Sequence, residues 1–274
     1  MKVICLVDNS VEPSSPFWGE HGLAFLIETE RKRVLFDTGA SGELLLHNLS
    51  LAGIDPADIS AVALSHAHDD HTGGLAAFLQ RRGRPPVYYA HPDFLLPRFS
   101  RHKEVTESIG LPLDPEALRR QADLRLSPTP QEILPGVWTT GEISARPEPE
   151  GRSPGHLLDN GHDLVPDPYR DDMALVLEAP TGLVLVCGCC HAGLLNTLLH
   201  VQGVFGRLPA AVIGGTHLVA AKPCDLRHTV EVLRRLGPPA LYPNHCTGWA
   251  ASVALATALG DRVAPCPAGS TLEF

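Results

Sequence analysis

Short apolar runs bounded by polar or turn residues recur along the chain, and most have the length of a β-strand. Three such runs lie close together at the start, which predicts an antiparallel β-meander. Later runs are each followed by a polar turn, and several then lead into a segment with helical spacing. This alternation predicts an α/β fold. The expected strands are 3–7, 23–27, 33–36, 59–64, 87–90, 137–143, 173–178, 183–186, 211–213 and 240–242.

Apolar segments between these strands predict helices, and polar residues before them mark where the helices begin. Ser41 and Asp225 are candidate N-caps. Asp114, which precedes a proline, predicts the start of another helix. Pro85-Pro86 are expected to break the chain after the second helix. The helical segments are 44–49, 75–79, 194–198 and 230–236.

Two stretches lack a regular pattern. Residues 93–132 are expected to form an insertion that could overhang a site, with basic side chains on a solvated face or, alternatively, in a phosphate-holding cluster. Residues 144–170 are rich in Pro and Gly and predict a long irregular loop. With 274 residues, 44% of them hydrophobic, the chain 1–274 fits one domain with a sizeable core. The basic side chains of the insertion are Arg98, Arg101, His102 and Lys103.

The stretch SHAHDDHTGG, residues 65–74, joins an expected strand to an expected helix. Neutral imidazoles and ionised carboxylates are ligands that zinc, iron and manganese accept. His66 and His68 can both point at one ion from an extended segment, and Asp70 and His71 can then face a second ion. A polar surface turn is the alternative, but three His and two Asp within six positions favour a metal site.

Three later strands also lead into a turn that carries a His, namely His191, His217 and His245. Strand ends along one sheet edge are where an α/β fold gathers a site, so the repetition favours a shared site over separate core histidines. Cys189 lies two residues before His191, and both could face a metal, because thiolate and imidazole suit zinc or iron. Cys187 continues the strand alternation and is expected in the core.

Composition narrows the partners and the compartment. The net charge of −9 argues against a broad nucleic-acid interface, although a small anion can still bind locally. No apolar run is long enough to span a membrane, and the first residues lack the features of a signal peptide. Seven Cys, three of them within 187–190, fit reduced thiols or metal ligands better than a disulfide framework. We expect a cytoplasmic protein without nucleic-acid or membrane partners, and a homo-oligomer is compatible with the sequence.

The H-x-H-x-D-H pattern at 66–71 resembles the metallo-β-lactamase superfamily. The resemblance implies an α/β fold, the αββα four-layer sandwich, with one or two metals at its upper edge. It implies that His66 and His68 bind the first metal, and that Asp70 and His71 bind the second. It also implies that Asp37, in an FDTG-type turn, supports the metal loop through its carboxylate instead of binding metal.

Further motifs resemble one branch of this superfamily, the proteins related to 7,8-dihydropterin-6-methyl-4-(β-D-ribofuranosyl)aminobenzene-5′-phosphate synthase. This resemblance implies that His191 and His245 bind metal and that His217 lies in the pocket. His156 and His162 are alternatives to His191, because the superfamily's more usual third His precedes the second hairpin. The motifs are VDN at 7–9, EHGL at 20–23, SHAHDDHTGG at 65–74, TGEI at 140–143, CGCCHAGLLNT at 187–197, GGTHL at 214–218 and HCTG at 245–248.

We therefore expect a metal-dependent hydrolase or transferase that acts on an anionic small molecule containing phosphate or diphosphate. The expected cofactor is a pair of divalent ions, zinc first, with iron or manganese as alternatives. Asp70 would orient the nucleophile, His217 would stabilise the developing oxyanion or protonate the leaving group, and Cys189 would approach the second metal. The predicted substrate contacts are Glu20, His21, Thr216 and His217.

Three other classes are weighed against this expectation. An iron-dependent oxidoreductase acting on oxygen, nitric oxide or sulfur compounds is favoured by the thiols at 187–190 and disfavoured by the lack of a flavin-binding segment. A structural zinc protein is disfavoured because the motifs offer more ligands than a closed tetrahedral site takes. A nuclease is disfavoured by the acidic net charge.

Overall fold

The computed structural model describes residues 1–30, 32–83 and 87–274, so the break expected at Pro85-Pro86 lies outside the described residues. The chain divides into two compact units. The prediction of one domain over 1–274 stays a prediction. The first unit comprises Met1–Pro128, Ser153–Asp171 and Pro267–Glu273, and the second comprises Thr129–Arg152, Asp172–Cys266 and Phe274.

The first unit is built on a seven-stranded mixed sheet with the order β17-β1-β2-β3-β4-β5-β8. The predicted meander β1-β2-β3 is antiparallel, whereas β3, β4, β5 and β8 run parallel to one another. The parallel strands matter for function because their carboxyl ends meet at one edge. The strands are β1 (Lys2–Val7), β2 (Ala24–Glu28), β3 (Arg33–Phe36), β4 (Ala61–Ala63), β5 (Val87–Ala90), β8 (Asp123–Leu126) and β17 (Thr271–Glu273).

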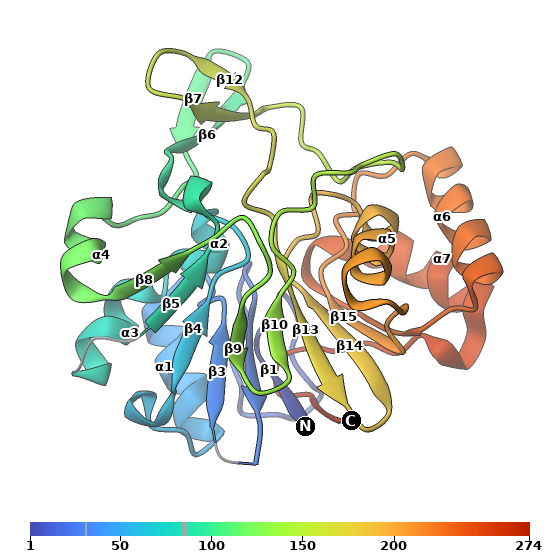
Figure 1. The fold of residues 1–274 in the computed structure, drawn as a ribbon, viewed down its shortest axis with the longest axis horizontal. Coiled ribbons are helices and arrows are strands. Elements are labelled where there is room, and N and C mark those ends of the chain that lie inside the picture. The colour runs from blue at the N-terminus through green and yellow to red at the C-terminus, as the bar shows by residue number, and fades with distance from the viewer. Residues whose placement is uncertain (31, 84–86) are drawn as a thin grey trace. The chain divides into compact units, whose positions relative to one another are not determined.

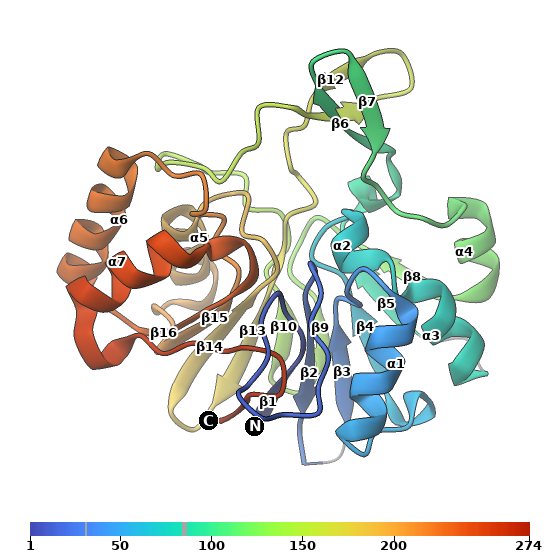
Figure 2. The same ribbon diagram turned by 180° about the vertical axis from the view of Figure 1, so that it is seen from behind.

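Two helices cover one face of this sheet, as Figure 2 shows. Helices α1 (Gly42–Leu51) and α3 (Leu75–Arg82) place Leu45 and Phe78 in one buried cluster with sheet residues such as Leu35. Burying an apolar stripe of each helix on the sheet supplies the main driving force for this packing.

Two of the three predicted N-caps are confirmed. The side chain of Ser41 accepts a hydrogen bond from Leu44 N at 3.4 Å, and Asp114 begins α4 (Pro115–Gln121). The prediction for Asp225 is wrong, because α6 (Pro223–Leu236) begins earlier, with Lys222 as its N-cap. The helix starts early because Pro223 fixes a helical φ at the first turn, where its missing N–H costs nothing.

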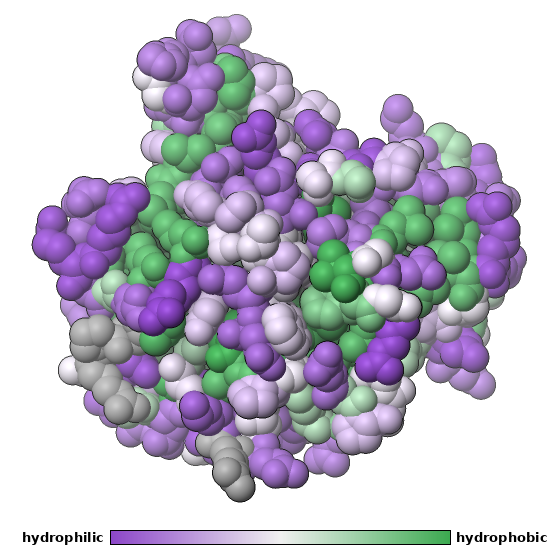
Figure 3. Space-filling view, viewed as in Figure 1, coloured by the Kyte–Doolittle hydropathy of each residue, from purple (hydrophilic) through white to green (hydrophobic). Residues whose placement is uncertain are grey.

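Four strands of the first unit form a separate antiparallel sheet, here called the arm, with the order β12-β11-β6-β7. The arm lies at the top of Figure 1, and hydrophilic residues dominate its outer end in Figure 3. The expected irregular loop over 144–170 is confirmed for 144–155, which contains no helix or strand, and is wrong for 156–166, which contains two of the strands. The strands of the arm are β6 (Arg98–His102), β7 (Val105–Ser108), β11 (His156–Asp159) and β12 (Leu164–Pro166).

The second unit is built on a six-stranded sheet with the order β16-β15-β14-β13-β10-β9. Strands β13 and β14 form the predicted hairpin, and β14, β15 and β16 run parallel. Helices α5 (Leu194–Phe205), α6 and α7 (Trp249–Leu259) contribute to the buried cluster of this unit. The strands are β9 (Glu132–Leu134), β10 (Val137–Thr139), β13 (Ala174–Ala179), β14 (Gly182–Cys187), β15 (Ala211–Gly214) and β16 (Ala240–Pro243).

Four short 3-10 helices complete the described secondary structure. Across residues 1–30, 32–83 and 87–274, no helix combines the length and apolar character needed to cross a membrane. The 3-10 helices are η1 (Pro56–Asp58), η2 (Pro92–Leu95), η3 (His245–Thr247) and η4 (Gly260–Arg262).

Arg98, at the start of the arm, is buried, so the prediction of a solvated face is wrong for this residue. Its Nε lies 3.0 Å from Asp167 Oδ2, and its Nη2 lies 2.7 Å from Asp171 Oδ1. Its Nη1 donates to the backbone carbonyls of Asp93 and Leu96. Burial raises the pKa of Asp171, while the Arg98 guanidinium acts in the opposite direction. Arg98 thus joins the arm to two buried carboxylates.

Replacing Arg98 by Met is expected to lower the free energy of unfolding by about 3–5 kcal/mol, because two buried carboxylates lose their cation. Denaturant unfolding of the full chain measures the loss. Arg101→Met is the matched control, because Arg101 is an exposed arginine of the same strand, and its loss should stay within about 0.5 kcal/mol. Equal losses in the two variants would contradict the role of the buried network.

Candidate metal centre

In the first unit, three neighbouring parallel strands end beside the metal-binding motif. Asp37 follows β3, Ser65 and His66 follow β4, and His91 follows β5. The motif continues into the short helix α2 (Asp69–Thr72) and then α3. The sheet therefore fixes where each of these side chains starts.

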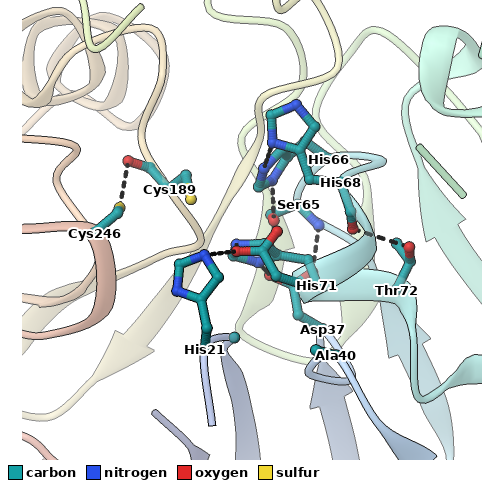
Figure 4. A network of polar contacts seen from close by, with 12 residues as sticks. His21, Asp37, Ala40, Ser65, His66, His68, His71, Thr72, Cys189 and Cys246 are labelled. Atoms are coloured by element: carbon teal, nitrogen blue, oxygen red, sulfur yellow. Dashed lines mark hydrogen bonds and ion pairs between the residues drawn. The ribbon is translucent and has the colours of Figure 1, made fainter. Parts of the chain in front are cut away.

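The carboxylate of Asp37 organises the motif, as Figure 4 shows. Asp37 Oδ1 accepts from Ser65 N at 2.7 Å. Its Oδ2 accepts from Ser65 Oγ and from His71 Nδ1, each at 2.7 Å. All three residues are fully buried, so these bonds form without competition from solvent. The next residue, Thr38, donates from both N and Oγ1 to the carbonyl of His71.

This network assigns the tautomers of two histidines. Ser65 Oγ has one proton, which it donates to Asp37, so toward His66 Nδ1 at 2.8 Å it must accept. His66 therefore carries its proton on Nδ1. His71 also donates from Nδ1, because the carboxylate only accepts. When the two rings are neutral, the Nε2 atom of each keeps its lone pair, and this is the form of histidine that binds a metal.

The geometry around His66 fits a divalent metal ion. His66 Nε2 and His68 Nδ1 lie 3.0 Å apart and share a hydrogen bond in the absence of an ion. Two nitrogen ligands of one tetrahedral zinc, each about 2.0–2.1 Å from the ion, lie roughly 3.3 Å apart. Burial lowers the pKa of His68 well below its usual value, so its ring is neutral near pH 7 and able to act as a ligand. The donor set thus suits zinc or a similar ion.

Asp70 places a carboxylate near two histidine rings, those of His71 and His21. Its Oδ2 lies 3.7 Å from His71 Nε2 and 3.4 Å from Nε2 of His21, whose side chain is 73% exposed. Asn9 Nδ2 lies 3.3 Å from Nδ1 of the same ring. Asp70, His71 and His21 therefore form a cluster in which His71 is buried and His21 is exposed to solvent.

In the second unit, three neighbouring parallel strands also end in histidine turns. His191 follows β14, His217 follows β15 and His245 follows β16, so the three turns lie at one edge of the sheet. His191 Nδ1 donates to the carbonyl of Gly151 at 2.8 Å, which leaves its Nε2 as a lone pair. Its ring centroid lies 4.3 Å from that of His217.

Backbone strain marks the same turns. Among the described residues, seven other than glycine have a left-handed φ, and four of them lie in the turns that follow the parallel strands β3, β14, β15 and β16. Such conformations cost roughly 1–3 kcal/mol each and cluster where function requires them. The four residues and their φ angles are Asp37 (59°), Cys190 (60°), His217 (46°) and His245 (47°).

His217 is held mainly by its backbone. Its N–H donates to Cys246 Sγ at 3.3 Å. Thr216, a predicted substrate contact, is buried and donates from both N and Oγ1 to Thr247 Oγ1. A Cβ on Gly151 would lie 2.5 Å from the Cβ of His217, so only glycine allows this approach. The turn is therefore held by several backbone contacts, and the imidazole of His217 lies beside that of His191.

Cys187 is fully buried in the apolar cluster of the second unit, as the sequence predicts. Hydrogen bonding from Cys190 and burial raise the pKa of the Cys187 thiol, so it stays protonated. Cys189 is buried at the strand end, and its carbonyl accepts from Cys246 Sγ at 3.5 Å. Its role as a ligand stays a prediction.

Two other predicted groups take up structural contacts. Glu20 Oε1 accepts from Ala40 N and Ser41 N at 3.0 and 2.9 Å, and so supports the start of α1. His156 lies beside His68, with ring centroids 5.0 Å apart, and its Nδ1 is 3.0 Å from Tyr169 Oη. His162 is exposed in the turn between β11 and β12. His156 is thus the rival ligand that lies near the motif.

Two consecutive residues that were not predicted from the sequence, Asp171 and Asp172, hold the histidine turns. Asp171 Oδ2 accepts from Ala67 N at 3.0 Å within the first unit, and Asp172 Oδ2 accepts from Ala192 N at 2.7 Å within the second. In the sequence they appear only as two acidic residues directly before an apolar strand. Such residues are expected to be exposed, whereas both are buried.

The fold and the donor groups are those of an α/β protein whose strand-end turns can hold metal ions. A model of the metallo-beta-lactamase superfamily matches residues 18–172, more than half of the chain. The chain is 32% identical over 264 residues to the 7,8-dihydropterin-6-methyl-4-(beta-D-ribofuranosyl)-aminobenzene-5'-phosphate synthase of Methanocaldococcus jannaschii, covering 92% of this chain and 89% of that protein. The chain belongs to the metallo-β-lactamase superfamily.

Solved structures agree with this assignment. A protein described as a metal-dependent hydrolase of the beta-lactamase superfamily is 26% identical, with a TM-score of 0.86 over 100% of this chain and 99% of that one. The metallo-beta-lactamase fold protein YhfI of Bacillus subtilis has a TM-score of 0.62 at 13% identity, covering 99% of each chain, and shows the fold alone. The predicted αββα fold class and the resemblance to the synthase branch are confirmed.

Replacing Asp37 by Asn is expected to weaken zinc binding by about 10- to 100-fold, because an amide cannot accept from all three donors and no longer fixes the two tautomers. Titration of the full chain with zinc against a competing chelator measures the affinity. Ser65→Ala, which breaks only the His66 branch, should lose less. Unchanged affinity in the Asn variant would contradict the tautomer argument.

Proposed function

We propose that this protein is a metal-dependent hydrolase or transferase acting on a small molecule that contains phosphate or diphosphate. The observation that carries the proposal is the Asp37 network, which leaves lone pairs on Nε2 of both His66 and His71. Such orientation of ligand rings by an outer carboxylate is typical of metal sites.

In this proposal, His66 and His68 bind one ion together with His191, and Asp70 and His71 bind a second together with His245. Cys189 approaches the second ion. The tautomer of His191 supports its part, as does the left-handed backbone of His245. When bound, divalent metals supply Lewis acidity and lower the pKa of a coordinated water.

Asp70 and His217 are proposed as the groups that act on the reactants. Asp70 would orient the nucleophile through its carboxylate. His217 would donate a proton to the oxygen of the leaving group, the role of a general acid. Gly214 and Gly215 precede His217, and a Cβ at these positions would lie 2.1 Å from Cys187 O and 2.4 Å from Gly188 O, so glycine lets this turn pack closely against residues 187–188.

The substrate class rests on the relative from Methanocaldococcus jannaschii, whose name includes both a dihydropterin and a phosphate. In a transfer reaction of this kind, the amino nitrogen of an aromatic amine would attack a pterin methylene group and form a C–N bond. The C–O bond to diphosphate would break, and the nitrogen would lose a proton. In a hydrolysis reaction, water would attack a phosphoryl or carbonyl group of the substrate. His21 and Thr216 are proposed as substrate contacts for both reactions.

Metal analysis of the purified full chain, followed by activity assays with a pterin diphosphate, phosphodiesters and lactones, tests the proposal. About two equivalents of zinc or manganese and turnover of one phosphorylated compound are expected. Iron, with redox activity on oxygen, nitric oxide or sulfur compounds, would favour the oxidoreductase alternative. A protein that binds no divalent metal would overturn the proposal.

His217→Ala is expected to retain the metal content and stability but to lose turnover by on the order of 10²-fold or more, the scale of general acid catalysis. Steady-state kinetics and metal analysis are measured on the same preparation. His162→Ala is the control, because His162 is an exposed histidine in a turn. Loss of a metal from the His217 variant would make His217 a ligand and reopen the assignment of His191 or His245.

A further inference from the structure

The side chain of Asp171 makes contacts in two directions. Its Oδ1 lies 2.7 Å from Arg98 Nη2, and its Oδ2 accepts from Ala67 N at 3.0 Å. The carboxylate is 1% exposed at the residue level, and its guanidinium partner is equally buried. A charge-assisted bond from a backbone N–H to a buried carboxylate is strong and directional.

The bond from Ala67 matters because of where Ala67 lies. It is the residue between His66 and His68, whose ring nitrogens are 3.0 Å apart. Fixing the N–H of Ala67 fixes the peptide plane that joins it to His66. The chain leaves this plane toward His68. Asp37 acts on the imidazole of His66, whereas Asp171 acts on the backbone that carries both rings.

Asp172 makes the corresponding bond in the second unit. Its Oδ2 accepts from Ala192 N at 2.7 Å, and Ala192 directly follows His191. The residue is 1% exposed. This bond fixes the peptide plane between His191 and Ala192, close to the hydrogen bond that His191 makes with Gly151.

We propose that Asp171 and Asp172 are positioning residues for metal binding, each holding the backbone of one histidine turn. The inference rests on the proposed function in taking His66, His68 and His191 as ligands. Neither aspartate is itself a ligand in this proposal. Both act through a backbone N–H beside a ligand, so their loss should loosen the ligand geometry without removing a donor atom.

Asp167 provides a matched comparison. Its Oδ2 lies 3.0 Å from Arg98 Nε, so it shares the same buried arginine. Its Oδ1 accepts from Tyr169 N at 2.7 Å, outside the metal-binding motif. Asp167 and Asp171 therefore both contribute to the buried ion network, and the bond to the motif belongs to Asp171.

The experiment compares Asp171→Asn with Asp167→Asn in the full chain. Each variant is titrated with zinc alone against a chromophoric chelator, and its unfolding is measured in the metal-free state. Both variants should lose similar stability. Asp171→Asn should weaken zinc binding by about 10- to 100-fold, the usual effect of removing an outer support of a metal ligand. Asp167→Asn should stay within about threefold of the wild type.

The Asp172→Asn variant leaves the ion pair between Asp171 and Arg98 in place. It therefore still tests the inference if Asp171→Asn does not fold. It should weaken zinc binding to a similar extent. Equal zinc affinity for Asp172→Asn and wild type, or for Asp171→Asn and Asp167→Asn, would overturn the inference. If the wild type binds zinc but turns over no phosphorylated compound, the proposed reaction fails and this inference stands. If the wild type binds no zinc, the proposed function itself fails.

Discussion

The buried carboxylate of Asp37 is the constraint on which the metal-binding motif depends. One side chain accepts from a backbone N–H, a hydroxyl and an imidazole, and this set leaves no freedom in the tautomers of His66 and His71. Asp37 directly follows β3, and its backbone has a left-handed conformation. The pairing of β3 with β4 thus places Asp37 beside the turn that follows β4. There it determines which ring nitrogens of His66 and His71 carry a proton.

Each unit uses the same arrangement. In each unit, parallel strands place turns at one edge of the sheet, and a hydrogen-bond acceptor beside the turn orients an imidazole. Asp37 does this in the first unit, and the carbonyl of Gly151 does it for His191 in the second. The chemistry therefore lies in the turns, while the sheets supply only position, as expected where function is carried by sites placed on a common fold.

Much of the fold could be predicted because its signals are local. The strands at 33–36 and 87–90 agree with β3 and β5 to the residue, since β3 buries its apolar run and β5 buries every second residue. The histidine turns were found for the same reason. The arm was missed because β7 is exposed along its whole length and shows no alternation. The burial of Arg98 could not be predicted, because its partners Asp167 and Asp171 are distant in sequence.

The left-handed residues at the strand-end turns have a consequence for the energetics of the whole chain. At roughly 1–3 kcal/mol each, four such residues together cost an amount comparable with the net stability of a typical protein. Glycine at these positions would relieve the strain but would remove the very side chains that the turns present. An ion bound by the folded state stabilises it by mass action, so ligand binding and fold stability become one equilibrium. If these turns bind metal as proposed, metal supply would shift the balance between the folded and unfolded states of this protein.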